Sequence, residues 1–224
     1  MENETLAAPL ARKRGRPVGA DSEQTRMMIM RAARDIIAER GYQAASFQQI
    51  AQRAGVSRPT LHYYFATRED LYDKLLSDVC ERIRGCATTA LAEGSLLSQL
   101  ATFTVELGRL GEAEPALMKL VMTARIDHHQ AAQSHRAAAR IVSTVHAFYD
   151  AAVADAVRRG ELDAHSEPRA VADMLAALFW GFGFYAGFLA EDARSEATAK
   201  IARLLMRMVG SGLLNRTFAA AIDA

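Results

Sequence analysis

A short segment in the first third of the chain gathers side chains that suit contacts with nucleic acid. Residues 58–64, RPTLHYY, carry a guanidinium, three hydroxyl groups and an imidazole within one stretch of the chain. Arg58 can donate to O6 and N7 of guanine, whereas Pro59 and Thr60 can contact a thymine methyl group. The hydroxyl groups of Tyr63 and Tyr64 suit phosphate oxygens. This combination of residue types indicates a surface that reads DNA.

Two short helices joined by a sharp turn are predicted to position these side chains. Ser46-Phe47-Gln48-Gln49 is a capping box, which predicts a helix that begins at residue 47 and ends near residue 54. Gly55 can adopt the left-handed conformation that a tight turn requires, and Ser57 can cap the second helix. Such a pair places its second helix in the major groove, and we expect Leu61 and Phe65 to face the core.

The charge of the chain is unevenly distributed. Residues 11–68 contain 11 Lys and Arg against 4 Asp and Glu, although the whole chain has a net charge of only +1. A basic N-terminal third on an acidic body is typical of a protein that binds a polyanion and has a separate second function. A solvated charged face is the alternative.

The segment GYQAASFQQIAQRAGVSRPTLHYYFATREDLYDKLL, residues 41–76, resembles the tetracycline-repressor (TetR) family. The matching pattern is Gly-Tyr at a helix end, then Ile-Ala-x-x-Ala-Gly-Val-Ser, then Leu-x-x-Tyr-Phe-x-x-Arg-Glu-Asp-Leu. His62 stands where the family most often has Tyr, so that contact would be altered and sensitive to pH. The resemblance implies DNA-facing positions at Ser46, Gln48, Arg58, Pro59, Thr60, His62, Tyr63, Tyr64 and Arg68.

A basic tail precedes this segment. The sequence Arg12-Lys13-Arg14-Gly15-Arg16-Pro17 is similar to the Arg-Gly-Arg-Pro core of a minor-groove hook, with Arg14 and Arg16 as the inserted side chains. The alternative is an unstructured tail that only adds electrostatic affinity.

Helical periodicity continues along almost the whole chain, and no hairpin signals appear. Ile29, Ala33 and Ile36 share one apolar face of a helix that Asp21 or Ser22 can cap and Gly41 can end. The sequence predicts an all-α fold of about nine helices, with a flexible basic tail at 1–20, a helix-turn-helix domain at 21–68 and an effector-binding and dimerisation domain at 69–224. The later helices are expected at 68–92, 96–112, 115–131, 134–159, 167–190 and 195–214.

The strongest apolar segment is 174–190, MLAALFWGFGFYAGFLA, which carries no charge. A membrane anchor is the alternative that we disfavour, because acidic residues bracket the segment and no basic cluster flanks it. A helix that is apolar all round must be buried on every side, which a partner subunit would provide. With the last helix, it is similar to the four-helix dimer interface of the family. The expected interface residues are Gly183, Gly187, Leu204, Leu205 and Met208.

An apolar effector pocket is predicted within the larger domain. Aromatic and Met side chains would form its walls, and Arg125 or His146 would orient the effector. Ordinary core packing is the alternative for each residue. The candidates are Phe103, Leu107, Met118, Met122, Arg125, His146, Phe148, Tyr149, Trp180 and Phe184.

Residue groups suggestive of other chemistry do not form convincing sites. The adjacent His128 and His129 point in different directions on a helix, so no metal site is predicted. Cys80 and Cys86 lie six apart on one predicted helix, so a disulfide between them is not expected. We find no catalytic motif and expect neither an enzyme nor a cofactor.

These features together predict a cytoplasmic, dimeric, one-component repressor. It would bind double-stranded DNA at a pseudo-palindromic operator and would be released by a small, apolar effector. An activator, or a regulator that responds to oxidation of Cys80 or Cys86, is the alternative on the same fold. A membrane-associated helical protein is the alternative from a different class.

Overall fold

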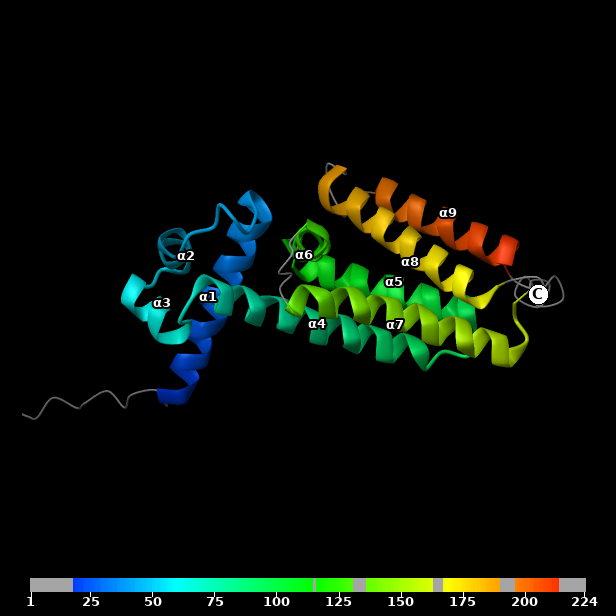
Figure 1. Ribbon diagram of the computed structural model, residues 1–224, viewed down its shortest axis with the longest axis horizontal. Coiled ribbons are helices and arrows are strands. Elements are labelled where there is room, and N and C mark those ends of the chain that lie inside the picture. Colours follow the sequence, from blue (N-terminus) through cyan, green and yellow to red (C-terminus); the bar gives the residue numbers. More distant parts are fainter. Residues whose placement is uncertain (1–17, 115, 131–135, 163–166, 190–195, 214–224) are drawn as a thin grey trace, which may run out of the picture.

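The computed structural model describes residues 18–114, 116–130, 136–162, 167–189 and 196–213 (Figure 1). Within these ranges the chain forms nine α-helices and one π-helical segment, and no strand. The helices are α1 (Val18–Arg40), α2 (Phe47–Ala54), α3 (Arg58–Tyr64), α4 (Arg68–Leu91), α5 (Leu96–Ala113), α6 (Ala116–Gln130), α7 (Arg136–Arg159), α8 (Pro168–Phe184), the π-helix η1 (Tyr185–Leu189) and α9 (Glu196–Leu213).

Helices α1, α2 and α3 pack together at one end of the elongated molecule (Figure 1). Their core contains Ile29 of α1, Ile50 of α2 and Leu61 of α3, each 0% exposed. The predicted apolar face of the first helix is therefore confirmed as the face that packs against α2. The exposed faces of the two short helices are left free for a binding role.

Helix α4 runs from this unit into the bundle formed by α5 to α9 (Figure 1). It is 24 residues long and packs mainly against α7 and α5. Its N-terminal Leu71 and Tyr72 are buried near the short helices, whereas Ile83 and Ala90 are buried farther along the bundle. A displacement of α4 would therefore change packing contacts at both ends of the molecule.

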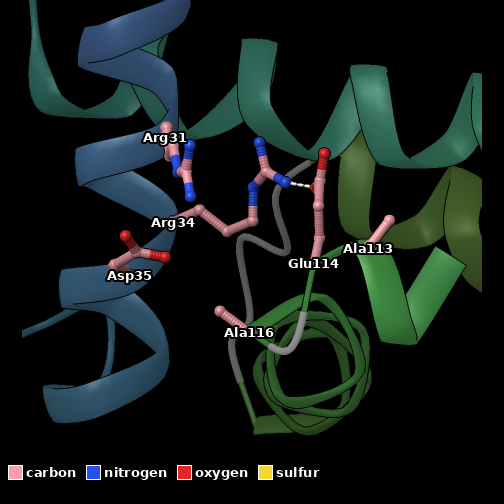
Figure 2. A pocket seen from close by; sticks show the side chains of 6 residues that line it. All are labelled: Arg31, Arg34, Asp35, Ala113, Glu114 and Ala116. Carbon is pink, nitrogen blue, oxygen red and sulfur yellow. Dashed lines mark ion pairs between the residues drawn. The ribbon is translucent and has the colours of Figure 1, made fainter.

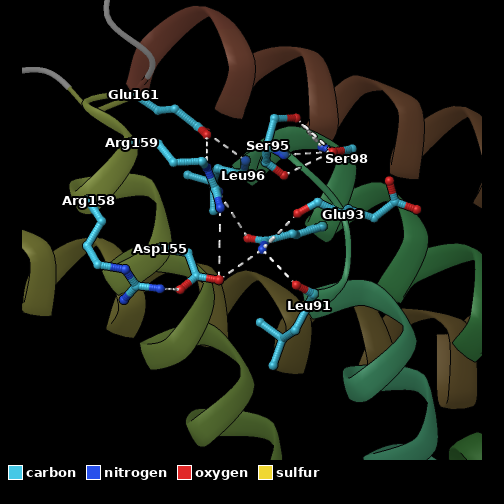
Figure 3. Close-up of polar contacts among 10 residues, drawn as sticks. Leu91, Glu93, Ser95, Leu96, Ser98, Asp155, Arg158, Arg159 and Glu161 are labelled. Carbon is cyan, nitrogen blue, oxygen red and sulfur yellow. Dashed lines mark hydrogen bonds and ion pairs between the residues drawn. The ribbon is translucent and has the colours of Figure 1, made fainter.

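A buried polar network connects the start of α5 with the end of α7 (Figure 3). Glu161 is 0% exposed, accepts a hydrogen bond from the backbone N–H of Leu96 at 2.6 Å and pairs with Arg159. Gln99, also 0% exposed, donates to Asp155 at 3.2 Å. Because these side chains join the start of α5 to the end of α7, they hold the α4–α5 turn in place beside the apolar contacts of Ala90 and Leu96.

The first helix begins earlier than the sequence predicted. Since α1 starts at Val18, neither Asp21 nor Ser22 is its cap, and that prediction is wrong. Asp21 lies in the first turn, where its charge is favourable to the helix dipole, and its carbonyl oxygen accepts from the Thr25 hydroxyl at 2.8 Å. The predicted end of the helix is confirmed, because Gly41 follows with φ 80°.

The most apolar helix is not α-helical over its whole predicted length. The α-helix ends at Phe184, and residues 185–189 form the π-helix η1. By length and composition the stretch Pro168–Phe188 could cross a membrane, with 21 residues and a mean hydropathy of 1.4. A core helix of a soluble protein meets the same criteria, so this finding is weak evidence for a membrane role.

Candidate functional site

Hydrogen bonds between neighbouring residues set the angle between α2 and α3. The Ser46 hydroxyl accepts from the N–H of Gln49 at 3.3 Å, while Gln49 Oε1 accepts from the Ser46 N–H at 3.1 Å. Gly55 ends α2 with φ 68°, and the Ser57 hydroxyl accepts from the N–H of Thr60 at 3.1 Å to begin α3. The predicted capping box, the glycine turn and the Ser57 cap of α3 are all confirmed.

Helix α3 directs its apolar side inward and its polar side outward. Leu61 and the following Phe65 are at most 1% exposed. Arg58 and His62 lie on the solvent side, and Tyr63 is 82% exposed. The polar edge of α3 is therefore available to a large partner such as a DNA groove.

Several of these side chains are already oriented by contacts within the chain. The Thr60 hydroxyl lies 2.7 Å from the Ser57 hydroxyl, so one of its hydrogen bonds is used in the cap. The His62 ring packs edge-on against Phe47 of α2, with centroids 4.9 Å apart, and Tyr63 and Tyr64 form a similar pair at 5.2 Å. Such contacts reduce the side-chain freedom that binding would otherwise have to remove.

The first residues of α2 lie on the same exposed side of the chain. Gln48 is exposed on this side. Ser46 is exposed too, but its hydroxyl is engaged with Gln49 in the capping box. Any phosphate contact at Ser46 would therefore share this hydroxyl or use backbone N–H groups at the start of α2.

Arg68 differs from the expectation of a DNA-facing residue. Its guanidinium donates to the carbonyl oxygens of Gln43 at 3.2 Å and Ala45 at 3.3 Å, and it lies 4.6 Å from the centroid of the Tyr42 ring. The Tyr42 hydroxyl in turn donates to Glu69 at 3.0 Å, and burial together with this bond raises the pKa of Tyr42. Arg68 thus holds the start of α4 against the loop between α1 and α2. Arg14 and Arg16 lie outside the described residues.

An ion cluster joins the short helices to the bundle. Glu114, at the end of α5, pairs with Arg34 of α1 (Figure 2). It also pairs with Arg82 of α4 at 2.7 Å. Arg34 is only 8% exposed, and burial followed by the charge of Arg82 lowers its pKa. Sequence reasoning missed this cluster, because Arg34 lies beside the apolar face of α1 and its partner Glu114 is 80 residues further along the chain.

A small cleft lies beside this cluster. It is lined by Arg31, Arg34 and Asp35 of α1 and by residues 113, 114 and 116 (Figure 2). Its volume of about 160 Å³ is below the roughly 300–1,000 Å³ typical of small-molecule sites. The cleft is therefore too small for the effector that the sequence predicts.

Four of the ten predicted pocket residues form closely packed core. The rings of Phe103 and Phe148 stack with centroids 3.9 Å apart, and Tyr149 packs against both. Leu107 is buried as well, and burial raises the pKa of Tyr149. Rings at this separation leave no room for a ligand between them. His146 is half-buried on α7, whereas Phe184 is 44% exposed, so Phe184 does not line an interior pocket in this structure.

The remaining pocket candidates meet at a seam between α6 and α8, together with two glycines predicted for the dimer interface. A Cβ atom added to Gly183 would lie 2.7 Å from Cε of Met122 and 3.3 Å from Sδ of Met118. One added to Gly187 would lie 3.6 Å from Cγ of Met118. Gly183 and Gly187 therefore face α6 of their own chain, and the prediction that they face a partner is wrong.

Exposed apolar side chains mark a second face of α8, η1 and α9. Leu204 and Met208 of α9 are 52% and 68% exposed, while Leu205 is half-buried. Met174 and Phe188 are also exposed, and with residues 177, 181 and 184 they recur at alternating spacings of three and four. This spacing defines one stripe along a helix, which is typical of a helix–helix contact.

Both cysteines lie in the interior of the bundle. Cys80 and Cys86 are free thiols, and both are buried. Burial, with the nearby charge of Glu106, raises the pKa of Cys86. Both conditions disfavour the thiolate that oxidation requires.

Residues 29–75 match the family described as bacterial regulatory proteins, tetR family. The HTH-type transcriptional activator FasR of Mycolicibacterium smegmatis (strain ATCC 700084 / mc(2)155) is 35% identical to this chain over 80 residues. That alignment covers 32% of this chain and 36% of FasR, so the chain spans little more than a third of the relative's length.

Solved structures share the fold over most of the chain. A γ-butyrolactone receptor (ArpA-like protein) has a TM-score of 0.70 and 22% identity, with coverage of 90% of this chain and 94% of that one. The regulator FadR from Bacillus subtilis, solved in complex with stearoyl-CoA, has a TM-score of 0.65 and 19% identity, with coverage of 82% and 97%. At these identities the similarity establishes the arrangement of helices.

Proposed function

Because the chain belongs to the TetR family of bacterial DNA-binding transcriptional regulators, we propose that it is a dimeric one-component repressor that a small, apolar effector releases from a pseudo-palindromic operator. The observation that carries this proposal is the outward-facing polar edge of α3, fixed on α2 by the turn at Gly55. The proposed DNA contacts are Ser46, Gln48, Arg58, Pro59, Thr60, His62, Tyr63 and Tyr64.

These residues divide into two roles. Arg58 lies at the exposed start of α3, where a guanidinium can fork onto one guanine and so distinguish base pairs. Tyr63 and Tyr64 lie at the other end of the helix and would bind phosphates, which positions the protein without reading sequence. Arg68 would act indirectly through its contacts with the loop between α1 and α2. The tail residues Arg14 and Arg16 would add contacts in the minor groove.

Dimerisation would cover the apolar stripe of α8, η1 and α9. Each subunit would contribute the exposed side chains of Leu204, Met208 and Phe188 to a two-fold symmetric interface, with Leu205 beside them. Two copies of α3 would then enter successive major grooves, about 34–36 Å apart. The proposed units are a tail at 1–20, a DNA-binding domain at 21–68 and an effector and dimerisation domain at 69–224.

Coupling between effector and DNA would pass through α4 and the Arg34–Glu114–Arg82 cluster. Helix α4 is shared by both ends of the molecule, and Glu114 ties α1 to the start of α6. An effector that shifts α6 would therefore change the spacing of the two α3 helices. A coupling free energy of about 1–3 kcal/mol would change DNA affinity about 5- to 150-fold without unfolding.

The division of roles on α3 can be tested by DNA-binding titrations. A site is first selected from random duplex DNA, and each variant is then titrated on that site and on a scrambled one. Arg58→Ala is expected to lose about 1–3 kcal/mol of discrimination between the two, because the guanine contact disappears. Tyr64→Phe is expected to weaken both sites about equally. The same loss of discrimination in both variants would show that the roles are assigned wrongly.

Size-exclusion chromatography without detergent tests the assembly. We expect a soluble species of about 49 kDa, twice the 24.4 kDa chain, in keeping with a cytoplasmic regulator. A protein that is soluble only in detergent would instead support the membrane-associated alternative. An activator on the same fold is the second candidate, because FasR is named an activator. A reporter gene placed under the selected site distinguishes the two by the sign of the response.

A further inference from the structure

We propose that the seam between α6 and α8 binds an amphipathic anion, namely a carboxylate on an aliphatic chain. Arg125 and Trp180 would bind the carboxylate, and the chain would replace the side chains of Met118 and Met122. This inference rests on the proposed function only in naming the effector class, because binding can be measured without DNA.

The seam is a continuous antiparallel contact with a defined register. Met118, Met122 and Arg125 are spaced four and three residues apart and so share one face of α6. Opposite them, Met118 contacts Gly187, and Met122 contacts Gly183. The register continues to Arg125, whose guanidinium carbon lies 5.8 Å from the centroid of the Trp180 ring. One end of the seam is therefore polar and the other is apolar.

The polar end offers hydrogen-bond donors that have no acceptor among the described residues. Nε1 of Trp180 is buried and makes no hydrogen bond within those residues. Arg125 is half-buried, and in the described part of the chain its guanidinium has the Trp180 ring as its partner and no carboxylate. Indole N–H and guanidinium groups can only donate. A ligand that satisfies both must supply acceptor oxygens, and the positive charge favours a carboxylate over a neutral carbonyl.

The seam can open beside Gly183 without breaking a rigid contact. There the α6 face is approached by Met side chains, and Cε of Met122 occupies the position a side chain at 183 would take, whereas at Gly187 the backbone of Lys119 lies as close as Cγ of Met118. Methionine is unbranched and adapts to new neighbours, so the thioethers can move aside for an aliphatic chain. The π-helix η1 begins two residues after Gly183, and such segments often mark functional sites.

The chain provides its own spectroscopic probe, because Trp180 is the only tryptophan. Its emission is titrated with dodecanoate, dodecylammonium and acetate, each below its micellar concentration. We expect a saturable change with dodecanoate, a much weaker one with dodecylammonium and none with acetate. An equal response to dodecanoate and dodecylammonium would overturn the proposal, as would the absence of a saturable response to dodecanoate.

Matched variants locate the site. Arg125→Gln is expected to weaken dodecanoate binding about tenfold or more, because a charge-assisted hydrogen bond is lost. Arg125→Lys keeps the charge and is expected to retain most of the affinity. Arg109→Gln removes an exposed charge on α5, outside the seam, and should leave binding unchanged. Circular dichroism checks that each variant is folded, and affinity that is unchanged in a folded Arg125→Gln variant would overturn the assignment.

This test separates the two proposals. If the protein binds its selected DNA site but Trp180 does not respond to dodecanoate, the seam proposal fails and the regulator proposal stands. If dodecanoate binds but no DNA site can be selected, the reverse holds. A dodecanoate complex that also releases the DNA would join the two, and this release should weaken in Arg125→Gln.

Discussion

Two glycines, one in each of two regions of the molecule, are required for different physical reasons. Gly55 lies in the turn between α2 and α3, with φ 68° and no neighbouring atom within 4 Å of an added Cβ. Gly183 lies in α8, where an added Cβ would meet Met122 at 2.7 Å. The turn depends on backbone conformation, which is a local property, whereas the seam depends on a contact with another helix. The first region can therefore be read from sequence, and the second requires the fold.

The largest expected effect concerns Glu114, which joins these two regions. Glu114→Gln would leave Arg34 and Arg82 close together without their carboxylate. We expect a loss of about 2–3 kcal/mol in the free energy of unfolding, which is less than for a fully buried pair because the Glu114 side chain is 29% exposed. Urea denaturation of both proteins measures this difference.

Glu112→Gln is the matched control, because Glu112 is exposed two residues earlier on α5. The stability of that variant should change by no more than about 0.5 kcal/mol. If the two variants are equally stable, the ion cluster does not hold α1 to the bundle. The helix-turn-helix unit and the bundle would then not be coupled in stability through Glu114.

The next effect tests the local region. Gly55→Ala should lower the free energy of unfolding by about 1–2 kcal/mol, since a side chain disfavours the left-handed conformation. Steric overlap does not contribute, because no atom lies within 4 Å of the added Cβ. Gly85→Ala is the matched control: Gly85 lies inside α4 with open space around it, so alanine should stabilise the helix by about 0.5–1 kcal/mol. The midpoint temperature of thermal unfolding should thus fall in Gly55→Ala and rise in Gly85→Ala. A stabilised Gly55→Ala variant would mean that the turn does not require a positive φ.

The local region shows how far the sequence alone can go. Ser46, Gly55 and Ser57 each act on a backbone group within a few residues, so their types and spacing were enough to predict both ends of α2 and the start of α3 correctly. The inward side of α3 followed from its apolar residues in the same way. The predicted start of α1 was wrong, because the helix begins at Val18, ahead of both residues that were expected to cap it.

The bundle shows where such reasoning stops. A helix that is apolar on all sides has no period to reveal which face meets which neighbour, so Gly183 was assigned to a partner instead of to α6. Phe103 and Phe148 were predicted as pocket walls, because sequence shows residue type but not the stacking that fills the space. The pairing of Arg34 with Glu114 depends on residues far apart in the chain, and only the fold brings them together.

The smallest expected effect tests the seam. In Gly183→Ala the added Cβ would displace Cε of Met122, which is the flexible end of a side chain, and alanine also favours the helix. These effects oppose each other, so we expect the free energy of unfolding to change by less than about 1 kcal/mol. The emission of Trp180 should nevertheless shift, because Met122 and Arg125 share the face of α6 that Trp180 contacts. Gly108→Ala, on an open side of α5, should leave the emission unchanged. An unchanged spectrum in Gly183→Ala, or a loss of stability as large as that of Gly55→Ala, would mean that the seam is as rigid as the turn and cannot open for a ligand.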